Sequence, residues 1–167
     1  MEMTIKPLET VEKLLPPFHG QNAQLIAYVA AKGTATPEQI MRDLKMPRST
    51  TYLLLKQFAV MGLLKEEKEG RSSRVSVPDF VFHIKNTAYI GEVKITPRNV
   101  LAFDAVHTSS GRMFAEHHGW KKFYKFVDLY DDYARGNITS QLMARELEVT
   151  RFEIELLLSD IKAKPRA

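Results

Sequence analysis

The sequence predicts a mainly α-helical protein with a small β wing, and three observations lead to this fold class. Residues 34–77 follow the order helix, sharp turn, helix and short hairpin. Capping and stop residues stand at the ends of these helices. Residues 137–161 then repeat the helix-turn-helix order. We therefore expect an N-terminal helix-turn-helix with a β wing, followed by a C-terminal helical region that contains a second helix-turn-helix.

The first helix of the 34–77 stretch has well-marked ends. Thr36 is suited to cap its N-terminus, Pro37 to occupy its first helical position, and Gln39 completes a T-x-x-Q capping box. Pro47 disfavours helical geometry in the residue before it, so the helix should end near Lys45–Met46. Its apolar stripe consists of Ile40, Met41 and Leu44.

The second helix should run from Pro47 to Met61, with Gly62 as its stop. Helical spacing turns one set of side chains inward: Thr51, Leu54, Leu55, Phe58 and Met61. It leaves a polar set outside: Arg48, Ser49, Thr50, Tyr52, Lys56 and Gln57. The outer set contains no carboxylate and many hydrogen-bond donors. This is the chemistry that a helix needs in the major groove of DNA.

A hairpin is expected directly after this helix. Val75 and Val77 alternate with Ser76 beyond a charged run and Gly70. This pattern predicts two antiparallel strands, with Arg71 and Arg74 at or near the tip. There they can contact phosphate or enter the minor groove of DNA.

The segment PRSTTYLLLKQFAVMGLL resembles the recognition helix of prokaryotic or archaeal winged-helix regulators of the MarR, IclR and TrmB type. In those families a phrase S-R-S-T-V-Y-x-x-L-x-x-L-x-x-x-G-L-I precedes a basic wing. The resemblance covers residues 22–78. It implies a winged helix-turn-helix that binds double-stranded DNA sequence-specifically as a homodimer and regulates transcription.

Charge and composition agree with an intracellular nucleic-acid-binding protein. Residues 42–74 hold eight cations and four carboxylates, so they account for the formal charge of +4 of all 167 residues. Mixed charges that merely solvate a surface are the alternative reading. Cysteine is absent, and no apolar run approaches the ~20 residues needed to span a membrane. Residues 1–6 lack the basic and then apolar pattern of a secretory signal. We therefore expect a cytoplasmic protein without membrane contact.

The chain divides into four expected parts: an N-terminal helix and linker (1–20), the winged helix-turn-helix domain (21–79), a connecting β/α segment (80–119) and a C-terminal helical domain (120–167). Residues 8–15 should form an amphipathic helix, which packs either on a partner subunit or on its own domain. Thr34–Ala35 can add a short bridging strand.

The connecting segment gives the weakest signals. Strands are expected within 79–86 and 87–96, then a helix starting at Thr96–Pro97, with a break at 109–111. It can cover the winged unit, form a dimer interface or line a ligand pocket.

Three histidines and two carboxylates in this region can be drawn as a metal site: His107, His117, His118, Asp104 and Glu116. Their spacing matches no established ligand motif, so we favour surface or helix-end histidines, and a loop position for His19.

No catalytic or cofactor-binding motif is present, so we expect a protein that is not an enzyme and needs no cofactor or metal. Residues 120–135 interleave aromatics with lysines, a pattern that can stack single-stranded bases. The commoner cause is a helix buried on two sides, by its own core and by a partner, which we favour.

The C-terminal helix-turn-helix is loosely similar to small antitoxin-like proteins with a Y-R-x-G-x-I-S pattern. Its second helix carries Glu153, Glu155 and Asp160, which phosphates repel. We therefore expect it to serve dimerisation or contact with another protein rather than DNA. Leu53, on the outer side of the first unit, together with the acidic wing strand leaves an alternative function open: a winged-helix protein-interaction or assembly adaptor.

Overall fold

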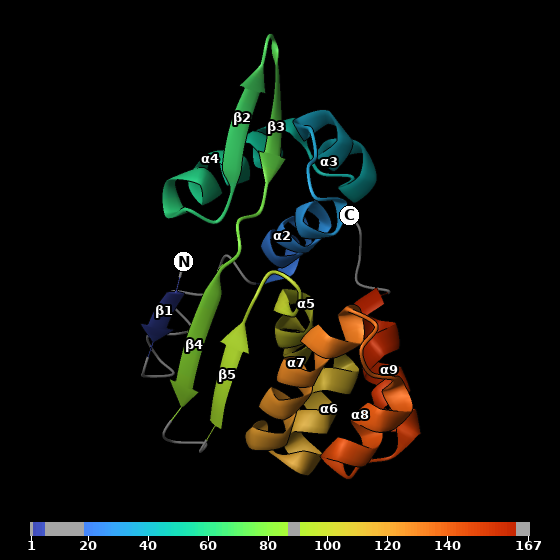
Figure 1. Cartoon of the computed structure of the whole chain (residues 1–167). Helices are drawn as coiled ribbons and strands as arrows, with labels where there is room; N and C mark the ends of the chain where they lie inside the picture. The colour runs from blue at the N-terminus through green and yellow to red at the C-terminus, as the bar shows by residue number, and fades with distance from the viewer. Residues whose placement is uncertain (1, 6–18, 87–90, 163–167) are drawn as a thin grey trace.

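A computed structural model describes residues 2–5, 19–86 and 91–162, and Figure 1 shows their arrangement. The described chain is mainly helical with two small sheets, which confirms the coarse fold class. One cluster of buried side chains runs through both halves of the molecule. The helix expected over residues 8–15 lies outside the described residues.

Three helices open the N-terminal unit: α2 (Gly20–Lys32), α3 (Pro37–Leu44) and α4 (Arg48–Met61). Both arms of the capping box form, since the Gln39 backbone N–H donates to Thr36 Oγ1 and the Thr36 N–H donates to Gln39 Oε1. Lys45 ends α3 in the left-handed region (φ 53°), and Gly62 ends α4 there (φ 78°). The two helices predicted within 34–61 are thus confirmed with their caps and stops, except that Pro47 precedes α4 as its N-cap.

The α4 helix buries the predicted stripe with one exception. Thr51, Leu54, Leu55 and Phe58 are buried, whereas Met61 is 46% exposed. The prediction of Met61 as a core residue was wrong. Met61 is the last residue of the helix, and the chain turns at Gly62 so that Leu63 and Leu64 fill the core in its place.

A hairpin follows α4 and projects from one end of the molecule (Figure 1). Its strands β2 (Lys65–Glu69) and β3 (Ser72–Ser76) pair antiparallel on either side of Gly70–Arg71. Ala35 forms an isolated antiparallel bridge to Val75, so the predicted bridging strand is confirmed as a single residue pair. This bridge and the buried Val75 side chain anchor the hairpin base to the helices.

The second sheet has three strands in the order β1-β4-β5. The two strands expected in the connecting segment are present as β4 (Val81–Asn86) and β5 (Gly91–Ile95), paired antiparallel. Strand β1 (Glu2–Ile5) adds to β4 in parallel, a pairing between distant segments that the sequence did not predict. Val93 and Ile95 are fully buried, and β5 packs on helix α7.

The chain then forms α5 (Val100–Asp104), a short 3-10 helix η2 (Ala105–His107) and α6 (Ser109–His118). The predicted break at 109–111 was wrong, because these residues begin α6. Thr108 caps α6 by accepting the Gly111 N–H, and Gly111 has no side chain because the Ala105 carbonyl lies against it. The helix expected at Thr96–Pro97 starts at Val100 instead, after Asn99 binds the backbone of Lys94 and Thr96.

Three helices complete the described chain: α7 (Trp120–Ala134), α8 (Ser140–Leu147) and α9 (Arg151–Lys162). On α7, Phe123, Tyr124 and Phe126 are at most 2% exposed, packed against β5, α5, α6 and α8. These rings are unavailable to stack on bases. The prediction of an aromatic helix buried by its own chain is confirmed, and its burial by a partner stays a prediction.

The α8–α9 pair reproduces the α3–α4 pair at a constant sequence offset. Thr36 and Thr139 cap the first helices, and Lys45 and Glu148 make the turns with φ of 53° and 56°. The inward side chains correspond one to one: Ile40, Leu44, Leu54, Leu55 and Phe58 with Met143, Leu147, Leu157, Leu158 and Ile161. The described chain therefore contains two helix pairs of the same local design, α3–α4 and α8–α9.

Candidate nucleic-acid interface

The exposed side of α4 carries most of the residues predicted to bind DNA. Five of the six are exposed: Arg48, Ser49, Tyr52, Lys56 and Gln57. Thr50, the sixth, is half-buried beside the inward stripe. No acidic residue occurs anywhere along α4. The helix thus presents a cationic and hydrogen-bonding surface without groups that repel phosphate.

Two apolar residues lie in the middle of this surface. At 3.6 residues per turn, Ser49, Leu53, Lys56 and Val60 follow one another along the centre of the exposed side. Leu53 is 57% exposed and Val60 is 83% exposed. The sequence placed Leu53 outside but gave no weight to Val60. The surface is therefore mixed, polar at the N-terminal end of α4 and apolar towards its C-terminal end.

Arg48 is held by a neighbour on the same helix. Its guanidinium carbon lies 5.6 Å from the centre of the Tyr52 ring, one turn further along. Stacking of this kind restricts an arginine side chain while leaving its hydrogen-bond donors free to act. Arg48 and Tyr52 together form an ordered donor group at the start of α4.

The hairpin places its two predicted arginines differently. Arg71 is exposed at the tip, next to Gly70. Arg74 lies on β3, where its Nε is 3.6 Å from a Glu69 carboxylate oxygen, and Lys65 is similarly 3.8 Å from Glu67. Two of the hairpin's four cations are thus partly neutralised within it. Within the described ranges, Lys68 and Arg71 have no carboxylate inside ion-pair distance.

A short hydrogen bond links α2 to α3. The Tyr28 hydroxyl donates to the Asp43 carboxylate, which also accepts from the Arg42 guanidinium. Burial and this bond raise the pKa of Tyr28 to about 12, and the same bond lowers the pKa of Asp43. Tyr28 is therefore a fixed donor at all ordinary pH values.

Helix α6 contacts one edge of the corresponding face of α9, and most of that face is exposed. Asp160, the counterpart of Gln57, accepts from Ser110 Oγ at 2.6 Å. Glu153, the counterpart of Thr50, lies 2.8 Å from His118 Nε2. The His118 contact is the main cause that lowers the pKa of Glu153. The outer side of α9 is therefore open like that of α4, but it carries Glu155 where α4 carries Tyr52, and a carboxylate repels phosphate.

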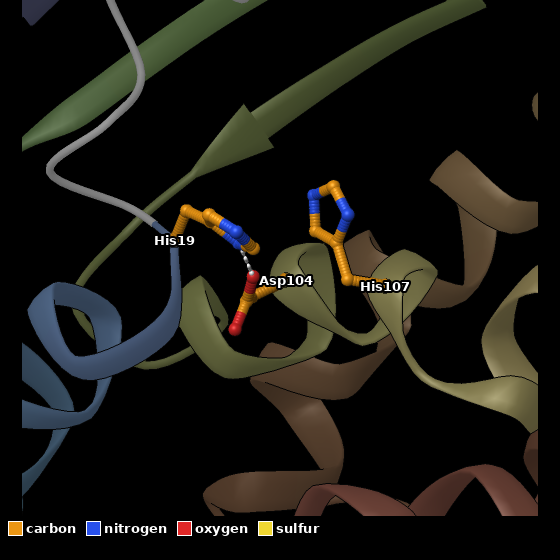
Figure 2. Close-up of side chains that lie close together, drawn as sticks. All are labelled: His19, Asp104 and His107. Atoms are coloured by element: carbon orange, nitrogen blue, oxygen red, sulfur yellow. Dashed lines mark hydrogen bonds and ion pairs between the residues drawn. The ribbon is translucent and has the colours of Figure 1, made fainter.

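The three histidines considered for a metal site do not come together in the structure. His118 binds Glu153, and the exposed His117 points elsewhere, with its ring centre 6.4 Å from that of His118. His107 and Asp104 instead meet His19, from the other end of the sequence (Figure 2). The loop position of His19 is confirmed, but its partner was missed. Burial, His19 and Arg112 together lower the pKa of His107.

Comparison with family models, curated proteins and solved structures finds no significant match for this chain. Within the described residues, no helix combines the length and the apolar character needed to cross a membrane. Function is therefore inferred below from the residues and their geometry.

Proposed function

We propose that the protein is a winged helix-turn-helix regulator of transcription that binds double-stranded DNA sequence-specifically as a homodimer. The observation that carries the proposal is the exposed, carboxylate-free face of α4 beside a projecting hairpin that carries Arg71 at its tip. In this reading α4 enters the major groove and the hairpin is the wing. The order of α2, α3, α4 and the hairpin, with the Ala35–Val75 bridge, supports the winged form.

Different residues have different roles in this proposal. Arg48 and Gln57 are able to pair with base edges through two hydrogen bonds each. Ser49 and Lys56 supply donors for phosphate oxygens. Arg71 at the hairpin tip contacts phosphate or enters the minor groove, and Arg74 contributes less because Glu69 competes for it.

The apolar residues on α4 are compatible with a major-groove helix. The C5-methyl group of thymine projects into that groove, and aliphatic side chains pack against it. Leu53 lies between Ser49 and Lys56 on the exposed side, so it would reach a base edge if they reach the backbone. A bound sequence that contains thymine at a fixed position is the expected consequence.

In vitro selection of duplexes by the full chain, with a parallel measurement of solution mass, tests the proposal. We expect an enriched palindrome whose half-sites lie about one helical turn apart, and a mass of two chains. Failure to enrich any sequence would contradict sequence-specific binding.

The double variant Arg48→Ala, Lys56→Ala tests the surface. Loss of the Lys56–phosphate contact should flatten the slope of log affinity against log salt by about 0.9, and loss of the Arg48 base contact should weaken binding about tenfold or more. Lys121→Ala, Lys122→Ala on α7 makes the same change in net charge away from α4 and should leave both quantities unaltered. If the α4 double variant binds as tightly as the unaltered protein at matched salt, α4 does not contact DNA.

A second candidate function rests on the exposed apolar residues. Leu53, Val60 and Met61 lie on α4, and two of the hairpin's cations are paired with its own glutamates. A protein-interaction or assembly adaptor would use such a mixed surface without reading DNA. Electrophoresis with random duplex at low salt separates the two functions, because an adaptor should give no retardation at micromolar protein.

A further inference from the structure

Three side chains that can bind a metal ion meet where the start of α2 lies against α5 and η2. His19 immediately precedes α2, Asp104 is the last residue of α5, and His107 is the last residue of η2. One potential ligand atom from each lies within 4.8 Å of the other two. Figure 2 shows Asp104 beside the His19 ring, with the His107 ring on the other side of the same space.

Asp104 is the buried member of this cluster. Its side chain is only 1% exposed, and its Oδ1 lies 2.6 Å from His19 Nδ1. Its Oδ2 accepts the backbone N–H of Gly20 at 3.2 Å, in the first turn of α2. The carboxylate therefore caps α2 from a distant segment and at the same time orients the His19 ring.

Capping alone accounts for Asp104 and His19 but not for His107. The His107 ring centre lies 4.1 Å from that of His19, with the planes tilted by 52°. The two imidazole rings are exposed to solvent, and the Asp104 carboxylate beside them is buried. The three side chains together provide three potential metal ligands around one space.

We propose that His19, Asp104 and His107 bind a divalent first-row transition-metal ion, with Zn²⁺ as the representative. Imidazole nitrogen and carboxylate oxygen suit such ions, and three protein ligands leave a fourth position for water. Ligand atoms of a tetrahedral zinc site stand about 3.4 Å apart, given bonds of about 2.0–2.1 Å. Shifts of about 1–1.5 Å therefore assemble the site, and the exposed His19 side chain has room to make them.

The ion would join the start of α2 to the α5–η2 junction. These segments already pack on each other, and His19 lies at least 85 positions from the other two ligands in the sequence. A ligand that binds only the folded chain stabilises it by mass action. This site and the proposed DNA-binding function rest on different residues, so each can be tested without the other.

Calorimetric titration of the full, chelator-treated chain with ZnCl₂ tests the proposal. We expect one equivalent to bind, a higher unfolding temperature with Zn²⁺, and no binding of Mg²⁺, which prefers oxygen ligands. His107→Gln and His19→Gln should each weaken Zn²⁺ binding about 10- to 100-fold, while His117→Gln on α6 should not. Circular dichroism without metal checks that each variant is folded.

Two results would overturn the site. One is the absence of stoichiometric Zn²⁺ binding by the unaltered chain. The other is binding that both glutamine variants retain at full strength, which would assign the zinc to other histidines. Asp104→Asn is a less direct test, since it also alters the cap of α2.

Discussion

At the scale of single residues, Gly111 shows how a close backbone approach selects one amino acid. A Cβ at this position would lie 1.8 Å from the Ala105 carbonyl oxygen. Gly111→Ala must therefore push η2 away from α6, and overpacking of this kind costs about 1–3 kcal/mol or more. Chemical denaturation should show the loss as a lower midpoint at unchanged m-value.

Met113→Ala is a suitable comparison for Gly111→Ala. Met113 lies two residues later on α6 but is 55% exposed, so its loss should change the unfolding free energy by less than about 0.5 kcal/mol. Equal effects of the two substitutions would contradict the close approach of α6 to η2.

Glu153 gives a pH dependence whose sign follows from its contacts. It accepts from Thr150 in a capping box and from His118, and the His118 bond is the largest cause of its lowered pKa. A carboxyl with a lowered folded-state pKa adds stability above its ordinary value of 4.5, and this stability is lost as the pH falls through the folded-state pKa.

Glu153→Gln isolates this effect, because glutamine keeps the T-x-x-Q capping box and removes the charge. The unaltered protein should be more stable than the variant near pH 6, and the difference should shrink towards about pH 3. Urea unfolding at several pH values measures it. Parallel stability curves for the two proteins would show that the charge of Glu153 contributes nothing.

Single-residue predictions from sequence succeeded where the cause is local. Thr36 and Gln39 are three positions apart, so their capping box is legible in the chain. His19 and Asp104 are 85 positions apart, and no local pattern marks them as partners. The small polar run at 109–111 looked like a break, because the contact that requires Gly111 comes from a backbone turn that the sequence does not display.

At the scale of elements, the two tight turns share an unusual feature. Lys45 and Glu148 both adopt left-handed backbone angles that favour glycine. Glu148→Gly should relieve this strain and stabilise the protein by up to about 1 kcal/mol, net of the greater freedom of glycine when unfolded. Thermal unfolding measures the gain. Glu148→Ala, which keeps a Cβ, should not reproduce it, and equal effects would mean that the turn is unstrained.

Helices were more predictable than sheets, because helix ends depend on residues that are close together in the sequence. The starts of α3 and α8 follow from Thr36 and Thr139, and both ends of α4 follow from a proline before it and a glycine after it. The β4–β5 hairpin is also local, and its strands were expected. The parallel addition of β1 to β4 joins residues 2–5 to residues 81–84, and hydrophobic patterning does not specify which distant strand an edge accepts.

At the scale of the whole molecule, the two helix-turn-helix units share one plan but differ in the charge of their outer sides. Tyr52 and Lys56 on α4 correspond to Glu155 and Ser159 on α9, so the second unit has lost a cation and gained an acid. In addition Glu153 and Asp160 at one edge of α9 bond to α6, although the outer sides of both helices are exposed. The segment that contains α4, whose outer side carries no acid, also holds the net positive charge of the chain.

Arg48 and Arg151 provide a matched pair for testing this division of roles. They occupy equivalent positions, and each makes one contact a turn along its own helix: Arg48 over the Tyr52 ring, and Arg151 at 3.3 Å from Glu155. Alanine at either site therefore removes one charge and one exposed contact of modest value. If α4 is the DNA-reading helix, Arg48→Ala should weaken binding to a selected duplex by about 1–3 kcal/mol, whereas Arg151→Ala should not. Fluorescence anisotropy at fixed salt measures both. A greater loss for Arg151→Ala would assign DNA to α9, and unchanged binding by both variants would remove Arg48 from the interface.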